Sequence, residues 1–101
     1  VNDELTLAQD HMLLLGRRTA DERVACFLLE FAGRFARAGW PVNPLTLPVG
    51  RGDIADYLGL SLETVSRSFS RLKKTGVLSL PNKRQVVILD KERLDELGGR
   101  A

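Results

Sequence analysis

Apolar side chains recur with helical spacing in the segment 51–74, in two stretches separated by a short break. The first stretch places three apolar residues on one side of a helix: Ile54, Ala55 and Leu58. Gly59 follows, where a left-handed residue commonly ends a helix. Ser61 is then a suitable N-cap for a second helix, because its hydroxyl can accept a hydrogen bond from a backbone N–H of the first turn. The spacing predicts two helices joined by a three-residue turn, which is a helix-turn-helix.

The second predicted helix has one apolar face and one polar face. At about 100° per residue, the apolar face holds Val65, Phe69 and Leu72, and the opposite face holds Glu63, Ser66, Arg67, Ser70 and Lys74. An arginine can donate two hydrogen bonds to guanine, a carboxylate can accept one from cytosine, and a serine can do either. Glu63, Ser66 and Arg67 therefore indicate contact with base edges in a DNA major groove. The alternative is a solvated face with an incidental Glu63–Arg67 pair, which stabilises a helix by about 0.2–0.5 kcal/mol.

These residues carry a family resemblance. The segment 51–74 resembles the helix-turn-helix of the Crp/Fnr family of bacterial transcription regulators, and the run Glu-Thr-Val-Ser-Arg at 63–67 is most similar to the Fnr and FixK branches. Those branches follow the pattern Glu-x-x-Ser-Arg, whereas the Crp branch typically has glycine at the position of Ser66. The resemblance extends over nearly the whole chain. It implies a winged helix-turn-helix fold, mainly α with a small β wing.

The resemblance also implies what the protein binds. It points to double-stranded DNA carrying the half-site TTGAT, or a close relative, in an inverted repeat read by Glu63, Ser66 and Arg67. It implies a homodimer in the full-length protein and leaves RNA polymerase as a candidate partner.

Six residues are expected to contact the DNA backbone: Arg51, Ser61, Thr64, Arg71, Lys83 and Arg84. The first three lie at the starts of the two helices, where backbone N–H groups favour anions, and they match backbone-contacting positions of the family. Gly50 and Gly52 stand where some relatives have a side chain, so those contacts are not expected here. Ser68 replaces a frequent aliphatic residue of the motif, so the docking of the helix is expected to depend on Val65, Phe69 and Leu72.

Two runs with strand character follow the second helix. Gly76 ends the helical pattern, and 77–80 and 85–89 flank the turn sequence Pro-Asn-Lys-Arg at 81–84. This pattern predicts a β-hairpin, the wing, over 77–89. The two basic residues of its tip suit phosphate contact, and a solvated turn with two charges is the alternative.

The N-terminal part carries an apolar stripe of Leu5, Ala8, Met12 and Leu15, with Gly16 as a stop. We expect 1–16 to be the end of a dimerisation and linker helix, followed by the winged helix-turn-helix domain over 17–101. The alternative is that the stripe packs on its own domain. Because the chain starts without Met and inside a predicted helix, we expect it to be part of a longer protein with a sensor elsewhere.

The segment 19–22 has the pattern of a capping box and predicts a scaffold helix with four core residues: Val24, Leu28, Phe31 and Phe35. Cys26 lies about 200° from Val24 around this helix. It is interpreted as a small packing residue, because nearby carboxylates would raise the pKa of its thiol rather than activate it.

The segment 39–50 holds three of the four prolines, which predicts a loop with a short strand near 45–47. Trp40 is expected to anchor this loop by packing. Asp90 is expected to cap a last short helix that closes over the core with Leu94 and Leu97.

Composition fits one small globular domain, with 101 residues, 44% of them hydrophobic and 28% charged. The net charge of +2 hides a local excess, because 61–84 contains six basic residues and one acid. A lone cysteine excludes an internal disulfide, and no cluster of cysteine and histidine predicts a metal, so no cofactor is expected in this fragment. No apolar run approaches the ~20 residues of a membrane span, so a cytoplasmic protein without a membrane partner is expected.

Two other classes of function fit the sequence less well. A winged helix can also serve as a protein-interaction module that never binds DNA, although the polar face of the second helix lacks the apolar anchors such a module needs. An enzyme is not expected, because the single histidine, His11, has no nucleophile or metal set near it in sequence.

Overall fold

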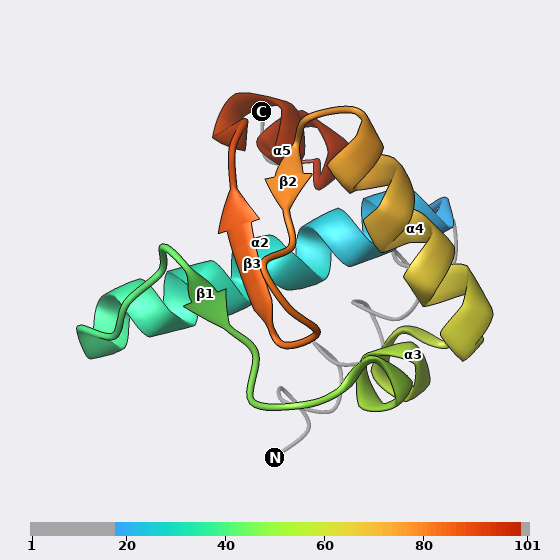
Figure 1. Cartoon of the computed structure of the whole chain (residues 1–101), viewed down its shortest axis with the longest axis horizontal. Helices are drawn as coiled ribbons and strands as arrows, with labels where there is room; N and C mark the ends of the chain where they lie inside the picture. The colour runs from blue at the N-terminus through green and yellow to red at the C-terminus, as the bar shows by residue number, and fades with distance from the viewer. Residues whose placement is uncertain (1–17, 100–101) are drawn as a thin grey trace, which may run out of the picture.

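The computed structural model describes residues 18–99, and this part of the chain contains four helices and a small sheet (Figure 1). The helices are α2 (Ala20–Ala38), α3 (Arg51–Leu58), α4 (Leu62–Lys74) and α5 (Lys91–Leu97), and the strands are β1 (Leu45–Thr46), β2 (Leu78–Ser79) and β3 (Gln85–Ile88). The predicted fold class, mainly α with a small β wing, is confirmed. The expected helix over 1–16 and His11 lie outside the described residues.

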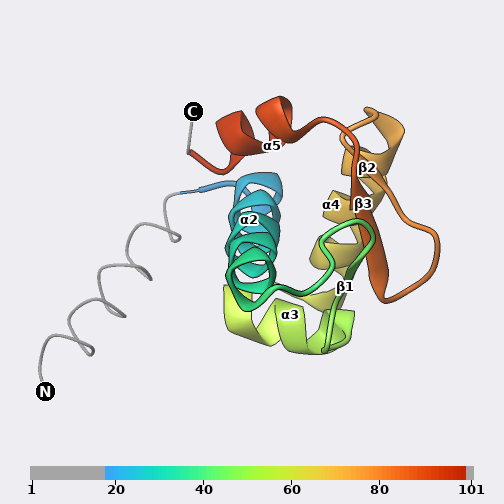
Figure 2. The ribbon, with the colours of Figure 1, turned by 90° about the vertical axis from the view of Figure 1, so that its left-hand side faces the viewer.

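Helix α2 is the scaffold of the domain and starts at the predicted capping box. The Thr19 hydroxyl accepts a hydrogen bond from the Glu22 N–H, and the Glu22 carboxylate accepts one from the Thr19 N–H at 2.8 Å. The helix runs behind the sheet and α4 (Figure 1), with α3 at one side of it and α5 at the other (Figure 2). It contacts both α4 and α5, so the placement of the other helices depends on it.

Helices α3 and α4 form the predicted helix-turn-helix. Gly59 ends α3 in the left-handed region, with φ of 69°, which glycine adopts without steric cost. After a turn of three residues, the Ser61 hydroxyl accepts a hydrogen bond from the Thr64 N–H at 3.1 Å and caps α4. The two local signals in the sequence thus define where one helix ends and the next begins.

The sheet has the antiparallel order β1-β3-β2, with β3 in the centre. Strands β2 and β3 form the wing hairpin, with Leu78 opposite Ile88. Strand β1 comes from the proline-rich loop and pairs Leu45 with Val86. The sequence predicted a short strand near 45–47 but did not indicate its partner.

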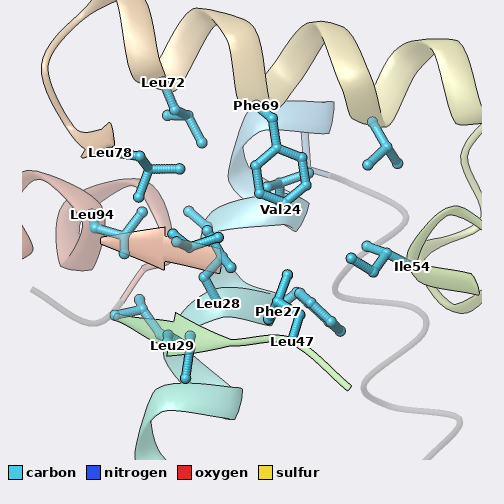
Figure 3. Close-up of a cluster of buried hydrophobic side chains, with 14 of the residues drawn as sticks. Val24, Phe27, Leu28, Leu29, Leu47, Ile54, Phe69, Leu72, Leu78 and Leu94 are labelled. Atoms are coloured by element: carbon cyan, nitrogen blue, oxygen red, sulfur yellow. The ribbon is translucent and has the colours of Figure 1, made fainter. Parts of the chain in front are cut away.

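One apolar cluster joins all of these elements (Figure 3). Its fully buried side chains come from every helix, from the sheet and from the residue before β2: Val24, Leu28, Leu45, Ile54, Val65, Phe69, Val77, Leu78 and Leu94. The core therefore holds α4 by its apolar face and leaves its opposite face to solvent.

Asp90 caps α5 by accepting a hydrogen bond from the Arg93 N–H at 3.0 Å, as the sequence predicted.

The structure tests the predictions made for two side chains, Trp40 and Cys26. Trp40 is 60% exposed and meets Phe35 in an edge contact, with ring centroids 5.1 Å apart, so the expectation that it anchors the loop by packing is wrong. The buried residues Leu45 and Leu47 hold that loop instead. Cys26 is half-buried against the core, and its thiol lies 3.8 Å from a carboxylate oxygen of Glu30, which supports its interpretation as a packing residue.

Candidate nucleic-acid interface

Helix α4 presents its polar face outward, as the sequence pattern predicted. Val65, Phe69 and Leu72 are buried against the rest of the domain. On the outward side, the side chains of Glu63 and Arg67 are 83% and 73% exposed. Ser66 is half-buried one turn after the helix start. The three predicted base-contacting residues thus lie together on one accessible side of the first turns.

Glu63 and Arg67 are close but not tightly bound to each other. The nearest carboxylate and guanidinium atoms, Oε2 and Nη2, are 3.8 Å apart. Exposed pairs of this kind contribute little to stability and exchange partners readily. Both side chains are therefore free to turn toward another partner.

A hollow of about 320 Å³ separates the start of the helix-turn-helix from the wing tip. Its lining residues are Gly50, Arg51, Gly52, Leu62, Ser66, Lys83 and Arg84. Three of the six predicted phosphate-contacting residues, Arg51, Lys83 and Arg84, meet here although more than 30 residues separate the first from the other two. Three cations around one concave surface attract anions.

The backbone at the start of α3 adds to this preference. Gly50 is the N-cap and offers no side chain to accept hydrogen bonds from the first N–H groups of the helix. A Cβ atom at Gly52 would meet no atom within 4 Å, so the surface there is open to close approach. Exposed N–H groups at a helix start favour anions.

The tip of the wing is held by one uncharged side chain. The Asn82 Oδ1 atom accepts hydrogen bonds from the backbone N–H groups of Arg84 and Gln85, both at 3.0 Å. The Asn82 Nδ2 group donates to the Gln85 Oε1 atom at 2.8 Å. These bonds fix the turn that carries Lys83 and Arg84.

Ser61 and Thr64 form a local pair at the start of α4. Their hydroxyl oxygens are 2.8 Å apart, and the Ser61 hydroxyl also caps the helix. Each hydroxyl has both donor and acceptor capacity, so a phosphate oxygen can be added to the arrangement without breaking the cap.

Arg71 lies apart from the hollow and is paired with Asp21 at the start of α2. Hydrogen bonds from Arg71 lower the pKa of the Asp21 carboxyl below its ordinary value, against the effect of partial burial, and the same bonds raise the pKa of Arg71. Asp21 was not predicted as a functional residue. Its only sequence signal was its place in the first turn of a helix, which is common for acidic residues and says nothing about a partner 50 residues away.

Among residues 18–99, no group of three or more histidine, cysteine, aspartate or glutamate side chains could hold a metal ion. No helix in this part of the chain is long and apolar enough to cross a membrane.

This fold and this polar helix define a winged helix-turn-helix domain of a DNA-binding transcription regulator. The family model described as the Crp-like helix-turn-helix domain matches residues 22–97, and the chain belongs to that family, which is part of the Crp/Fnr regulators.

Known relatives agree with this assignment. The chain is 50% identical over 95 residues to the transcriptional activatory protein AadR of Rhodopseudomonas palustris, covering 93% of this chain and 39% of that protein. The structure of FixK2 from Bradyrhizobium japonicum superposes with a TM-score of 0.81 at 50% identity, covering 95% of this chain and 46% of FixK2. BusR of S. agalactiae in complex with its busA-promotor DNA gives a TM-score of 0.51 at 25% identity, covering 78% and 37% of the two chains.

The chain thus spans about two fifths of the length of AadR. The predicted similarity to the FixK branch is confirmed, and these relatives are transcription regulators rather than enzymes.

Proposed function

We propose that this domain reads a TTGAT-like half-site in the major groove with Glu63, Ser66 and Arg67. The observation that carries the proposal is the arrangement of these three side chains on the outward side of α4, opposite the buried face. A helix presented in this way can enter the major groove of B-DNA, which is wide enough to admit it.

Each of the three side chains has a suitable base partner. Arg67 can donate two hydrogen bonds to the O6 and N7 atoms of a guanine, and Glu63 can accept one from the amino group of a cytosine. The hydroxyl of Ser66 can donate or accept. Their weak mutual contact of 3.8 Å leaves Glu63 and Arg67 available for these roles.

The backbone contacts are proposed to come from two places around the helix. In the hollow, Arg51, Lys83 and Arg84 surround a space suited to a phosphate, beside the uncapped start of α3. At the start of α4, the hydroxyls of Ser61 and Thr64 can bind a further phosphate. Such contacts fix the register of the helix on DNA but carry no sequence information.

The proposed action of the whole protein includes a second copy of the chain. An inverted repeat has two equivalent half-sites, so a homodimer would place one α4 on each of them. We propose that the segment 1–16 is the end of the helix that forms this dimer, and that RNA polymerase is a further partner. Reading of bases by these side chains requires no cofactor.

A fluorescence-anisotropy titration tests the proposal. The chain is titrated onto duplexes that carry TTGAT…ATCAA, TGTGA…TCACA or a scrambled sequence, each at two salt concentrations. The expected result is tightest binding to the first duplex and weaker binding to all three at the higher salt. Preference for the second duplex would overturn the half-site, and equal binding to all three would overturn base reading. No binding at low salt would overturn DNA binding by this domain and favour a protein-interaction module.

A further inference from the structure

Asp21 and Arg71 form a paired contact between the start of the scaffold helix and the recognition helix α4. The Arg71 Nε atom lies 3.2 and 3.1 Å from the two carboxylate oxygens of Asp21. The Arg71 Nη2 atom lies 2.8 Å from Asp21 Oδ1 and donates a further hydrogen bond to the Ser68 hydroxyl at 3.2 Å. The guanidinium is therefore held along one edge by two residues.

The two-bond geometry, with partial burial of Asp21 and a bond to the buried Ser68, makes this contact more specific than a single surface pair. Ser68 is fully buried, with 0% of its surface exposed. The side chain of Asp21 is 29% exposed and that of Arg71 is 52% exposed. The contact between a guanidinium and a carboxylate is stronger and more directional when two parallel N–H groups donate than when only one does. Arg71 is thus accessible from solvent but already committed to a partner.

The pair also changes the charge that α4 presents to DNA. Arg71 follows Arg67 by one helical turn, so it lies beside the outward face where a nucleic acid would approach. Paired with Asp21, its positive charge is neutralised at close range. A neutral pair displaces no counterion from DNA, whereas a free arginine contacting a phosphate does.

We propose that Asp21 is a positioning residue that withholds Arg71 from DNA phosphates and so lowers the affinity of this domain for DNA of any sequence. This inference rests on the proposed DNA binding. Because a phosphate contact carries no sequence information, the restraint lowers specific and non-specific affinity by the same factor, and the ratio between them stays set by the reading residues Glu63, Ser66 and Arg67.

The variant Asp21→Asn tests the proposal, because it removes the carboxylate charge and keeps the shape of the side chain. Binding of the chain to the scrambled duplex is measured by fluorescence anisotropy over a series of salt concentrations. For Asp21→Asn, the slope of the logarithm of the binding constant against the logarithm of salt concentration is expected to be steeper than for the wild type. The difference should be about 0.9, which corresponds to one added phosphate contact. Near 0.1 M salt the affinity gain is expected to reach up to about eightfold.

Two matched variants separate this effect from a general change of charge. Glu92→Gln removes one negative charge from the first turn of α5 and is expected to leave the salt slope at the wild-type value. Asp21→Asn in an Arg71→Ala background is expected to give the same slope as Arg71→Ala alone. Thermal unfolding of each variant confirms that the compared chains are folded under the conditions of the titration.

Three results would overturn the proposal. They are an unchanged or shallower slope for Asp21→Asn, an equal gain for Glu92→Gln, and an equal gain for Asp21→Asn when Arg71 is absent. A wild-type chain that binds no duplex would overturn the proposed DNA binding and this inference together. If the wild-type chain prefers the TTGAT duplex and Asp21→Asn has the same salt slope as the wild type, this inference alone would be overturned.

Discussion

The guanidinium carbon of Arg51 lies 4.8 Å from the centroid of the Phe69 ring. This contact joins the first residue of α3 to the buried face of α4. A guanidinium over an aromatic face is attracted to it, by about 0.5–1 kcal/mol where the site is exposed. The ring therefore has two roles, because it fills the core and also supports a cation at the border of the hollow.

Phe69→Leu tests the second role. The smaller side chain is expected to lower the free energy of unfolding by about 1–2 kcal/mol, since it leaves part of the core unfilled. In chains that remain folded, affinity for the TTGAT duplex is expected to fall because Arg51 loses its support. Arg51→Ala should reproduce the loss of affinity without the loss of core packing. Wild-type affinity in folded Phe69→Leu would show that the ring does not position Arg51.

Arg67→Ala is expected to weaken binding to the TTGAT duplex by about 1–3 kcal/mol, because two hydrogen bonds to a guanine are lost. Binding to a duplex with that guanine replaced should change much less. The comparison by fluorescence anisotropy needs a control of equal charge, and Arg37→Ala in the last turn of α2 provides one. An equal loss on both duplexes would assign Arg67 to phosphate contact.

Gly98→Ala is expected to destabilise the domain by about 1–3 kcal/mol, because overpacking forces neighbouring groups to move. A Cβ atom at this position would lie 2.5 Å from Leu29 Cδ1, a buried side chain of α2, and 3.5 Å from the Cα atom of Cys26. Chemical denaturation measures the change. Gly52→Ala, where a Cβ atom meets nothing within 4 Å, is the matched comparison and should be neutral or stabilising by up to about 1 kcal/mol, because alanine favours a helix more than glycine does. Similar losses at both positions would exclude close packing as the cause.

The domain is expected to become less stable at acidic pH, because two carboxyl groups at the start of α2 are protonated there. The pKa of the Asp21 carboxyl is lowered mainly by the hydrogen bond from Arg71, and the pKa of Glu22 is lowered mainly by the hydrogen bond from the Thr19 N–H. A carboxyl with a lower pKa in the folded state stabilises that state above its unfolded pKa of about 4, and this stabilisation is lost as the pH falls through the folded pKa.

The unfolding temperature should therefore decrease between about pH 5 and pH 3. The unfolding temperature of Asp21→Asn should decrease less over the same pH range, because this variant lacks one of the two carboxyl groups. Parallel curves for the wild type and Asp21→Asn would show that the Asp21–Arg71 pair does not contribute to the acid sensitivity.

The parts of the fold that could be predicted are those that depend on neighbours in sequence. Gly59 and Ser61 act on the residues next to them, so the sequence alone predicts the break between α3 and α4. The same holds for the capping box at Thr19 and for the hairpin turn, whose proline and asparagine are typical of turns.

Contacts between distant segments could not be predicted in the same way. Asp21 and Arg71 are 50 residues apart, and either could have been an ordinary surface charge. The pairing of Leu45 with Val86 depends on how the proline-rich loop folds back on the wing. Trp40 gave a misleading signal, because a large aromatic side chain usually packs more fully than it does here.

The hydrogen bonds that Asn82 makes at the wing tip have a consequence for the thermodynamics of binding. They hold the turn from within, and pairing of β3 on both sides holds the strand that follows. Lys83 and Arg84 thus belong to a preorganised arm whose backbone entropy was lost during folding. Association with a nucleic acid then costs mainly the rotamer freedom of two side chains, which preserves more of the favourable electrostatic energy as affinity.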